Sequence, residues 1–211
     1  TKQFSSPINV AIPSGNFGNA YSACFGRSNG LPVNKILCST NVNDVLRRFI
    51  ETGELAPEKT LPSIAPSMDI QIPSSLERLI FDFTDGASAF YDALVKEHKA
   101  KLSDENIIKL NHIFSSTTFL DDDIKSEIKS LYEEFGSIFD PHSVTSIRMA
   151  LNNQDSVPTV AIATASPEKF SNVIAPLIET SSVVAIEDKE EYLKLKNDKF
   201  AISESIKAYF S

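Results

Sequence analysis

The sequence is poor in the residues that mark several common protein classes. It has only two cysteines, Cys24 and Cys38, both in apolar surroundings and without metal-site spacing, so we expect buried free thiols and no metal. Lys and Arg number 20 against 28 Asp and Glu, and the net charge of −8 argues against non-specific nucleic-acid partners and anionic membranes. There is no membrane-length apolar run, signal-peptide pattern, internal repeat or low-complexity tract, so we expect a cytoplasmic protein without membrane partners.

A strand, a glycine-containing loop and a helix follow one another near the start of the chain. Residues 8–12 form a short apolar run rich in β-branched residues, which is typical of a buried strand. A proline and a serine end it, and Gly-Asn-Phe-Gly-Asn follows at 15–19, which we name the glycine loop. A helical pattern then covers residues 20–27. In an α/β sheet such a loop lies where ligands bind.

The glycine loop has the features of an anion site. Free backbone N–H groups and the positive end of the following helix attract a phosphate. Gly15 and Gly18 allow positive φ and close approach of a ligand, while Asn16 and Asn19 tolerate left-handed conformations and can cap the helix. The loop matches neither the dinucleotide fingerprint nor the P-loop, so an ordinary strand-to-helix turn remains the alternative.

The rest of the chain indicates an α/β fold, with an open, mostly parallel sheet and flanking helices. A second strand at 35–38 and a helix at 44–52 continue the alternation, which favours parallel strands with right-handed crossovers. Four prolines in 56–73 predict a long ordered loop with a short strand at 70–72. The chain returns to the sheet at 157–164, and Pro167 then begins a helix.

Residues 74–156 look mainly helical, and we expect a helical insertion between parts of the sheet. The divisions predicted are therefore 1–73, 74–156 and 157–211. Apolar spacing predicts a series of helices in the insertion, at 76–83, 87–101, 103–114, 121–135 and from Asp140 to Met149. The acidic run at 121–123 is typical of a capped helix start, with a metal triplet as the alternative. A short strand at 183–186 and a charged helical tail are expected to follow.

Three polar residues outside the glycine loop are further site candidates. Asp69, in the proline-rich loop, either contributes to a site or satisfies local backbone donors. His142 follows Asp140 and Pro141, which suit the N-cap and first helical positions, and it either titrates at a site or has a structural role. Thr164 lies at the carboxyl end of its strand, on the same edge as the glycine loop if the strands are parallel, or it caps the next helix.

A series of short motifs resembles the threonine synthases, which are pyridoxal-phosphate enzymes of the tryptophan-synthase-like fold type. The motifs occur in the family's order and span residues 8 to 180: Ile-Pro-Ser-Gly-Asn-Phe-Gly-Asn at 12–19, Gly-Leu-Pro-Val at 30–33, Ser-Thr-Asn-Val-Asn-Asp-Val-Leu at 39–46, Ala-Pro-Ser-Met-Asp at 65–69, Leu-Glu-Arg-Leu at 76–79, Asp-Pro-His at 140–142 and Ala-Thr-Ala-Ser-Pro at 163–167.

The resemblance implies a reaction, a cofactor and site residues. It implies conversion of O-phospho-L-homoserine and water to L-threonine and phosphate, with pyridoxal phosphate as the electron sink. The glycine-loop residues would hold the cofactor phosphate through their backbone amides, and Thr164 would meet the pyridine nitrogen; the loop residues are Gly15, Asn16, Phe17, Gly18 and Asn19. Ser166 replaces the histidine usual in the family.

The resemblance also indicates what this chain lacks. Family members are about twice as long, and no counterpart of the lysine motif that holds the cofactor as a Schiff base is present. We therefore expect the C-terminal portion of a threonine synthase, inactive without the N-terminal half as its partner. Two alternatives remain, a free-standing anion-binding or interaction domain and a threonine-synthase-like phospholyase.

Overall fold

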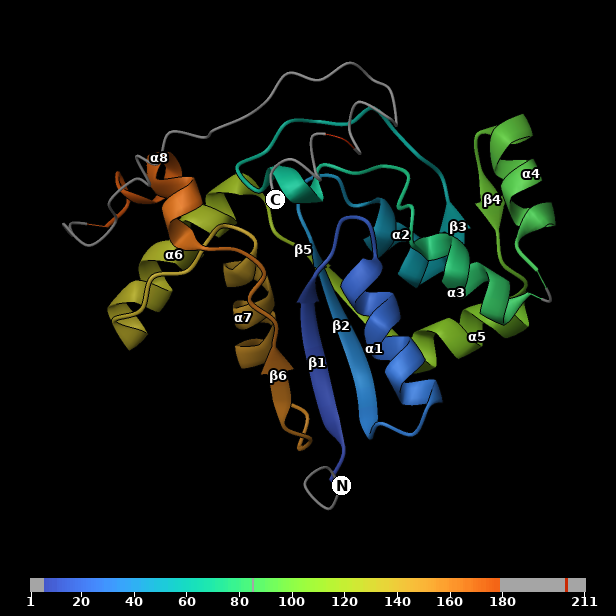
Figure 1. The fold of residues 1–211 in the computed structure, drawn as a ribbon, viewed down its shortest axis with the longest axis horizontal. Coiled ribbons are helices and arrows are strands. Elements are labelled where there is room, and N and C mark those ends of the chain that lie inside the picture. Colours follow the sequence, from blue (N-terminus) through green and yellow to red (C-terminus); the bar gives the residue numbers. More distant parts are fainter. Residues whose placement is uncertain (1–5, 85, 179–203, 205–211) are drawn as a thin grey trace.

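A four-stranded parallel sheet forms the centre of the computed structural model, which describes residues 6–84, 86–178 and 204. Its strand order is β5-β2-β1-β6, and each neighbouring pair is parallel (Figure 1). The strands are β1 (Ile8–Pro13), β2 (Val33–Thr40), β5 (Phe114–Thr118) and β6 (Thr159–Ala161). The expected α/β fold with a mostly parallel sheet is confirmed.

Alternation along the strands sends apolar side chains to both faces of the sheet. Val10 and Ile12 point into one buried cluster and Ala11, between them, points into another. In β2, the partner of Ala11 is Leu37, which lies in the same cluster as Ala11. Because both faces are apolar, both need a covering layer of helices.

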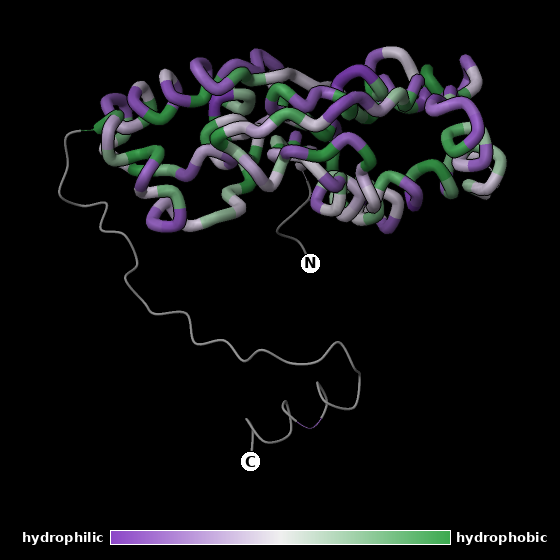
Figure 2. The backbone as a smooth tube through the Cα atoms, turned by 90° about the horizontal axis from the view of Figure 1, so that it is seen from above, coloured by the Kyte–Doolittle hydropathy of each residue, from purple (hydrophilic) through white to green (hydrophobic). Residues whose placement is uncertain are grey.

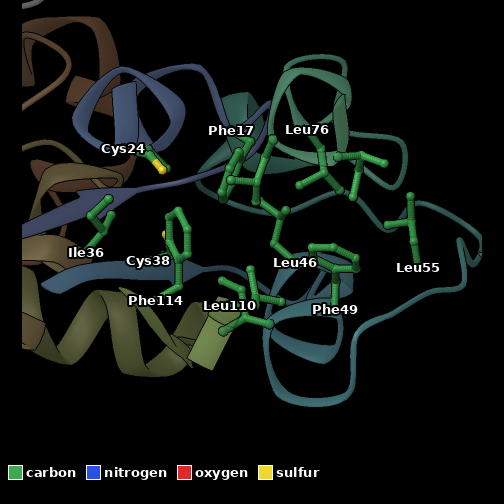
Figure 3. Close-up of a cluster of buried hydrophobic side chains, with 14 of the residues drawn as sticks. Phe17, Cys24, Ile36, Cys38, Leu46, Phe49, Leu55, Leu76, Leu110 and Phe114 are labelled. Carbon is green, nitrogen blue, oxygen red and sulfur yellow. The ribbon is translucent and has the colours of Figure 1, made fainter. Parts of the chain in front are cut away.

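Helices cover each face of the sheet (Figure 1). The first cluster contains three fully buried phenylalanines, Phe17, Phe49 and Phe114 (Figure 3). The helices on this side are α1 (Gly18–Ser28), α2 (Val45–Thr52), α3 (Leu76–Phe83) and α5 (Asp104–Ile113). The opposite side has α6 (Asp121–Phe135), α7 (Ser143–Asn152) and α8 (Ser171–Ile174), and α7 packs against β1, β2 and β6.

A short two-stranded sheet lies beside these layers. The strands β3 (Glu54–Leu55) and β4 (Ala100–Lys101) pair antiparallel, and α4 (Ser88–Glu97) packs against β4. Green and purple alternate along the helices in Figure 2, as expected for helices that bury one side.

The proline-rich segment is an ordered loop, as expected, but the strand predicted at 70–72 is wrong. Its regular structure is one 3-10 turn, η2 (Pro66–Met68). Asn43 holds the loop from the end of β2, because its Oδ1 accepts from the Leu61 amide and its Nδ2 donates to the Leu61 carbonyl, both at 2.8 Å.

Three helix boundaries in the middle of the chain differ from expectation. The helix predicted at 87–101 ends at Glu97, because His98 adopts a left-handed φ of 55°. The helix predicted at 103–114 ends at Ile113, and Phe114 begins β5, a strand of the main sheet. The helix predicted from Asp140 begins at Ser143. The segment expected to be a helical insertion therefore contributes a strand, and the three-part division stays a prediction.

Toward the C-terminus, the predicted strand at 157–164 is shorter and the next helix starts differently. The strand spans only Thr159–Ala161, and Pro167 opens a 3-10 turn, η3 (Pro167–Phe170), before α8. The strand expected at 183–186 and the helical tail lie outside the described residues.

The acidic run at 121–123 begins a helix, as predicted. The Asp123 carboxylate accepts from the Leu120 amide at 2.8 Å, which caps one of the free N–H groups at the start of α6. No cluster of metal-binding side chains occurs among the described residues. In the same part of the chain, no helix has both the length and the apolar composition needed to cross a bilayer.

Candidate functional site

A cavity of about 260 Å³ lies at the carboxyl end of β1. It brings together the glycine loop, the η2 turn, His142 and Thr164, which range from residue 15 to residue 164 in sequence. Among the described residues, its lining contains no carboxylate and no lysine; the lining residues are Pro13, Ser14, Gly15, Asn16, Phe17, Gly18, Asn19, Ser67, Met68, His142 and Thr164.

The backbone of the glycine loop offers hydrogen-bond donors to this cavity. None of the amides from Gly15 to Asn19 donates to another group within the described part of the chain. The amides of Gly18 and Asn19 belong to the first turn of α1, where no intrahelical partner exists. Unpaired amides at a helix N-terminus are suited to bind an anion.

The conformation of the loop corrects our assignment of roles within it. The positive φ, 68°, belongs to Phe17 and neither to Gly15 nor to Gly18. Phe17 is also the N-cap, so neither asparagine caps α1. The left-handed conformation is strained for an aromatic residue. The buried ring of Phe17, whose centroid lies 5.4 Å from that of Phe114, anchors it (Figure 3).

The two glycines serve different purposes. A Cβ on Gly15 would lie 2.6 Å from the Ser67 carbonyl oxygen and 3.0 Å from the Met68 Cα, so the loop packs directly on the η2 turn. The close approach observed at Gly15 is therefore to another segment of the chain, and the close approach to a ligand expected there stays a prediction. A Cβ on Gly18 would meet only the Ser75 hydroxyl, at 3.6 Å.

His142 uses both ring nitrogens within the fold. It is 3% exposed, its Nδ1 lies 2.8 Å from Asp140 Oδ1, and its Nε2 lies 3.2 Å from the amide nitrogen of Ser67. Because an amide only donates, Nε2 accepts and the proton is assigned to Nδ1. The ring also packs edge-on against Phe170. This arrangement supports the structural role that we weighed for His142.

Asp140 is completely buried beside His142. Burial opposes ionisation of its carboxyl group, but hydrogen bonds from His142 and Ser143 outweigh this and hold its pKa below the ordinary value. The carboxylate is therefore charged at neutral pH, directly behind the lining of the cavity.

Thr164 lies three residues beyond the end of β6, on the same edge of the sheet as the glycine loop, as expected for parallel strands. Its amide donates to the Ser143 hydroxyl at 3.0 Å. Its side chain is exposed, and its hydroxyl has no partner among the described residues. The neighbouring Ser166 bonds to Glu168 and does not line the cavity.

Asp69 does not line the cavity. One of its oxygens accepts from Asn41, Asn43 and the Ser63 hydroxyl, and the other accepts from the Ser63 amide at 3.1 Å. These contacts support the local role that we weighed for Asp69, which is to organise the proline-rich loop.

Two residues around the cavity were missed in the sequence. Ser143 contacts Thr164, which lies 21 residues away in sequence, and Ser67 contacts His142, which lies 75 residues away. The hint to Ser143 is the hydroxyl-rich Ser-Val-Thr-Ser at 143–146, whose three polar residues are buried, and Ser67 stands within the Ala-Pro-Ser-Met-Asp motif at 65–69. Buried hydroxyls need partners, but sequence alone does not name them.

Sequence comparison finds relatives that are named threonine synthase or threonine synthase-like. The chain is 31% identical to threonine synthase of Pseudomonas aeruginosa over 173 residues, which is 79% of this chain and 37% of that protein. It is 30% identical to human threonine synthase-like 1 over 197 residues, which is 90% of this chain and 26% of that protein. No protein-family model matches.

Solved structures give the same result. A PLP-bound threonine synthase from Brucella melitensis superposes with a TM-score of 0.81 at 25% identity, over 96% of this chain and 46% of that one. The chain is therefore related to the threonine synthases and the threonine synthase-like proteins. Yeast threonine synthase superposes with a TM-score of 0.78 at 25% identity, over 90% of this chain and 42% of that one. In each comparison, this chain spans less than half of the threonine synthase.

Proposed function

We propose that this chain supplies the phosphate-binding wall of a pyridoxal-phosphate site in an enzyme of the threonine synthase type. The single observation that carries the proposal is the cavity that the glycine loop, with its unpaired amides, and Thr164 line together. The structural relative from Brucella melitensis, which is PLP-bound, shares this fold and supports it.

The residues present suit the phosphate group of the cofactor. The donors are backbone amides at a helix N-terminus, and no carboxylate from the described part of the chain lines the cavity to repel an anion. The loop keeps its shape because Phe17 is anchored in the core and Gly15 packs on the η2 turn. The cradle is therefore preorganised, which lowers the entropic cost of binding.

Thr164 completes the proposed site from another segment of the cavity lining. Its exposed hydroxyl is free to donate to or accept from a ring nitrogen, and its backbone is fixed by Ser143. A hydroxyl in this position does not transfer a full proton to a pyridine nitrogen, unlike a carboxylic acid. When bound, pyridoxal phosphate supplies an electron sink for elimination of phosphate from O-phospho-L-homoserine and addition of water.

The amine that forms the Schiff base is proposed to come from polypeptide other than this chain. No lysine lines the cavity among the described residues. This chain alone is therefore proposed to bind the phosphate without catalysing threonine formation. Borohydride reduction of the chain with pyridoxal phosphate, followed by peptide mass spectrometry, tests this, and stoichiometric labelling of one lysine would refute it.

A phospholyase of the threonine synthase-like type is the second candidate. It is favoured by the match to human threonine synthase-like 1, which covers 90% of this chain. The two candidates are separated by the products that the whole enzyme makes from O-phosphohomoserine, because only a threonine synthase gives threonine.

Titration of the ¹⁵N-labelled chain with inorganic phosphate, pyridoxal phosphate and pyridoxal tests the proposed cradle. We expect the amide resonances of the glycine loop to shift with both phosphate-bearing ligands and not with pyridoxal. Asn19→Asp adds a negative charge to the exposed first turn of α1, and we expect roughly tenfold weaker phosphate binding.

Asn111→Asp is the matched control, because it adds the same charge to an exposed position of α5 whose residues do not line the cavity. Equal weakening by both variants would mean that net charge, and not the glycine loop, governs phosphate binding. Absence of any loop shift in the wild-type chain would overturn the proposed cradle.

A further inference from the structure

The two oxygens of the Asp140 carboxylate accept hydrogen bonds that lead to different parts of the cavity lining. Asp140 is 0% exposed and does not itself line the cavity. It lies just before α7, and its contacts divide into two branches that end at two different residues of the cavity lining, Ser67 and Thr164. We name Asp140, His142, Ser143, Ser67 and Thr164 the Asp140 cluster.

The Oδ1 branch leads to the glycine loop. Oδ1 accepts from the His142 amide at 2.9 Å, from the His142 ring Nδ1 at 2.8 Å and from the Ser143 amide at 3.4 Å. The opposite ring nitrogen then accepts from the Ser67 amide at 3.2 Å. Because the Ser67 carbonyl packs against Gly15, this branch fixes the surface on which the glycine loop rests.

The Oδ2 branch leads to Thr164. Oδ2 accepts from the Ser143 hydroxyl, which orients that hydroxyl so that its oxygen accepts from the Thr164 amide at 3.0 Å. The next hydroxyls of α7 strengthen the same connection, because Ser146 donates to the Ile162 carbonyl at 2.9 Å. This branch therefore sets the position of the chain after β6.

The geometry points to Asp140 as a positioning residue that fixes two parts of the cavity lining relative to each other, the surface under the glycine loop and the segment that carries Thr164. Since Oδ1 and Oδ2 belong to one planar group at the start of one helix, neither part moves without disturbing the carboxylate. The claim that a phosphate-bearing ligand occupies the cavity rests on the proposed function. The claim that Asp140 joins the two parts of its lining rests on the hydrogen bonds alone.

The asymmetry of the carboxylate gives a sharp test in Asp140→Asn. The amide oxygen of asparagine is expected to take the Oδ1 place, because three donors converge there. The amide NH₂ then occupies the Oδ2 place and donates to the Ser143 hydroxyl, whose orientation reverses. Only the Thr164 branch should therefore loosen.

Native-state hydrogen exchange of the full chain, without ligand, measures both branches. We expect Asp140→Asn and Ser143→Ala to speed exchange of the Thr164 amide about tenfold and to leave the Ser67 amide unchanged. His142→Phe keeps a ring against Phe170 but removes the ring nitrogen that accepts from the Ser67 amide. We therefore expect this variant to speed exchange of the Ser67 amide and to leave the Thr164 amide unchanged. Equal acceleration at both amides in all three variants would mean global destabilisation and would overturn the inference.

Phosphate titration of the same variants separates this inference from the proposed function. If wild-type binds phosphate at the glycine loop and His142→Phe binds severalfold more weakly, Asp140 and its partners position the cradle. If His142→Phe binds like the wild-type chain, positioning fails while the cradle stands. If wild-type shows no binding, the proposed function fails, and the exchange pattern alone decides the inference.

Discussion

Two aspartates in this chain lie at the centres of polar clusters that are alike in chemistry and different in reach. Asp69 accepts hydrogen bonds from Asn41, Asn43 and Ser63, which lie at the end of β2 and in the adjoining loop. We name these four residues the Asp69 cluster. The Asp140 cluster instead ends at Ser67 and Thr164, both of which line the cavity. The Asp69 cluster therefore organises one loop, whereas the Asp140 cluster connects two parts of the cavity lining.

Removal of each carboxylate should give the largest contrast. Asp140→Ala leaves buried donors of His142 and Ser143 without their acceptor, and we expect the free energy of unfolding to fall by about 3 kcal/mol. Asp69→Ala should cost only about 1–2 kcal/mol, because Asn41 still reaches the Ala65 carbonyl. Urea unfolding measures both values. Equal losses would show that the two clusters do not differ in energetic weight.

Gly15→Ala disturbs the contact between the glycine loop and Ser67, a member of the Asp140 cluster. The new Cβ would meet backbone atoms of Ser67 and Met68 at 2.6 and 3.0 Å, which cannot rotate away. We expect a loss of about 2 kcal/mol in unfolding free energy and faster exchange of the Ser67 amide. Gly18→Ala is the control, since its nearest neighbour would be 3.6 Å away, and it should be neutral within about 0.5 kcal/mol. A neutral Gly15→Ala would refute the tight contact.

Acid should weaken the Asp140 cluster in a defined direction. The pKa of Asp140 is held below the ordinary aspartate value by hydrogen bonds from His142 and Ser143 that outweigh burial. Its contribution to stability is therefore complete above the unfolded-state pKa of about 3.9 and is lost as the pH falls through the lower folded-state value. The stability difference between wild-type and Asp140→Asn, followed by urea unfolding, should be constant near neutrality and shrink below about pH 4. A difference that grows on acidification would contradict this.

The sequence predicted the parts of the fold that depend on local patterns. Apolar runs located β1 and β2, and the spacing of Ile124, Ile128 and Leu131 placed α6 at its observed bounds. The strand β5 was missed because Phe-Ser-Ser-Thr-Thr has one large apolar residue and follows a helical pattern directly. What makes it a strand is pairing with β2, a contact between segments 78 residues apart.

The same distinction applies to the candidate site. That the glycine loop and Thr164 meet at one edge followed from the order of parallel strands, which is a topological rule. The partners of Asp140 did not follow, because an aspartate before a helix has the same local pattern whether it only caps the helix or also holds a distant loop. Only the contacts of Ser143 and His142 across the fold distinguish the two roles.

The smallest expected effect is also the most direct comparison of the clusters. In Asp69→Asn, the amide oxygen can keep the three donors at Oδ1, and one bond from the Ser63 amide is lost, for about 1 kcal/mol. Hydrogen exchange at Thr164 and phosphate binding should stay within about twofold of wild-type, whereas Asp140→Asn speeds exchange at Thr164 about tenfold. If Asp69→Asn sped exchange at Thr164 as much as Asp140→Asn does, the Asp69 cluster would also be coupled to the cavity lining. The two aspartates would then not differ in whether their contacts extend to the cavity.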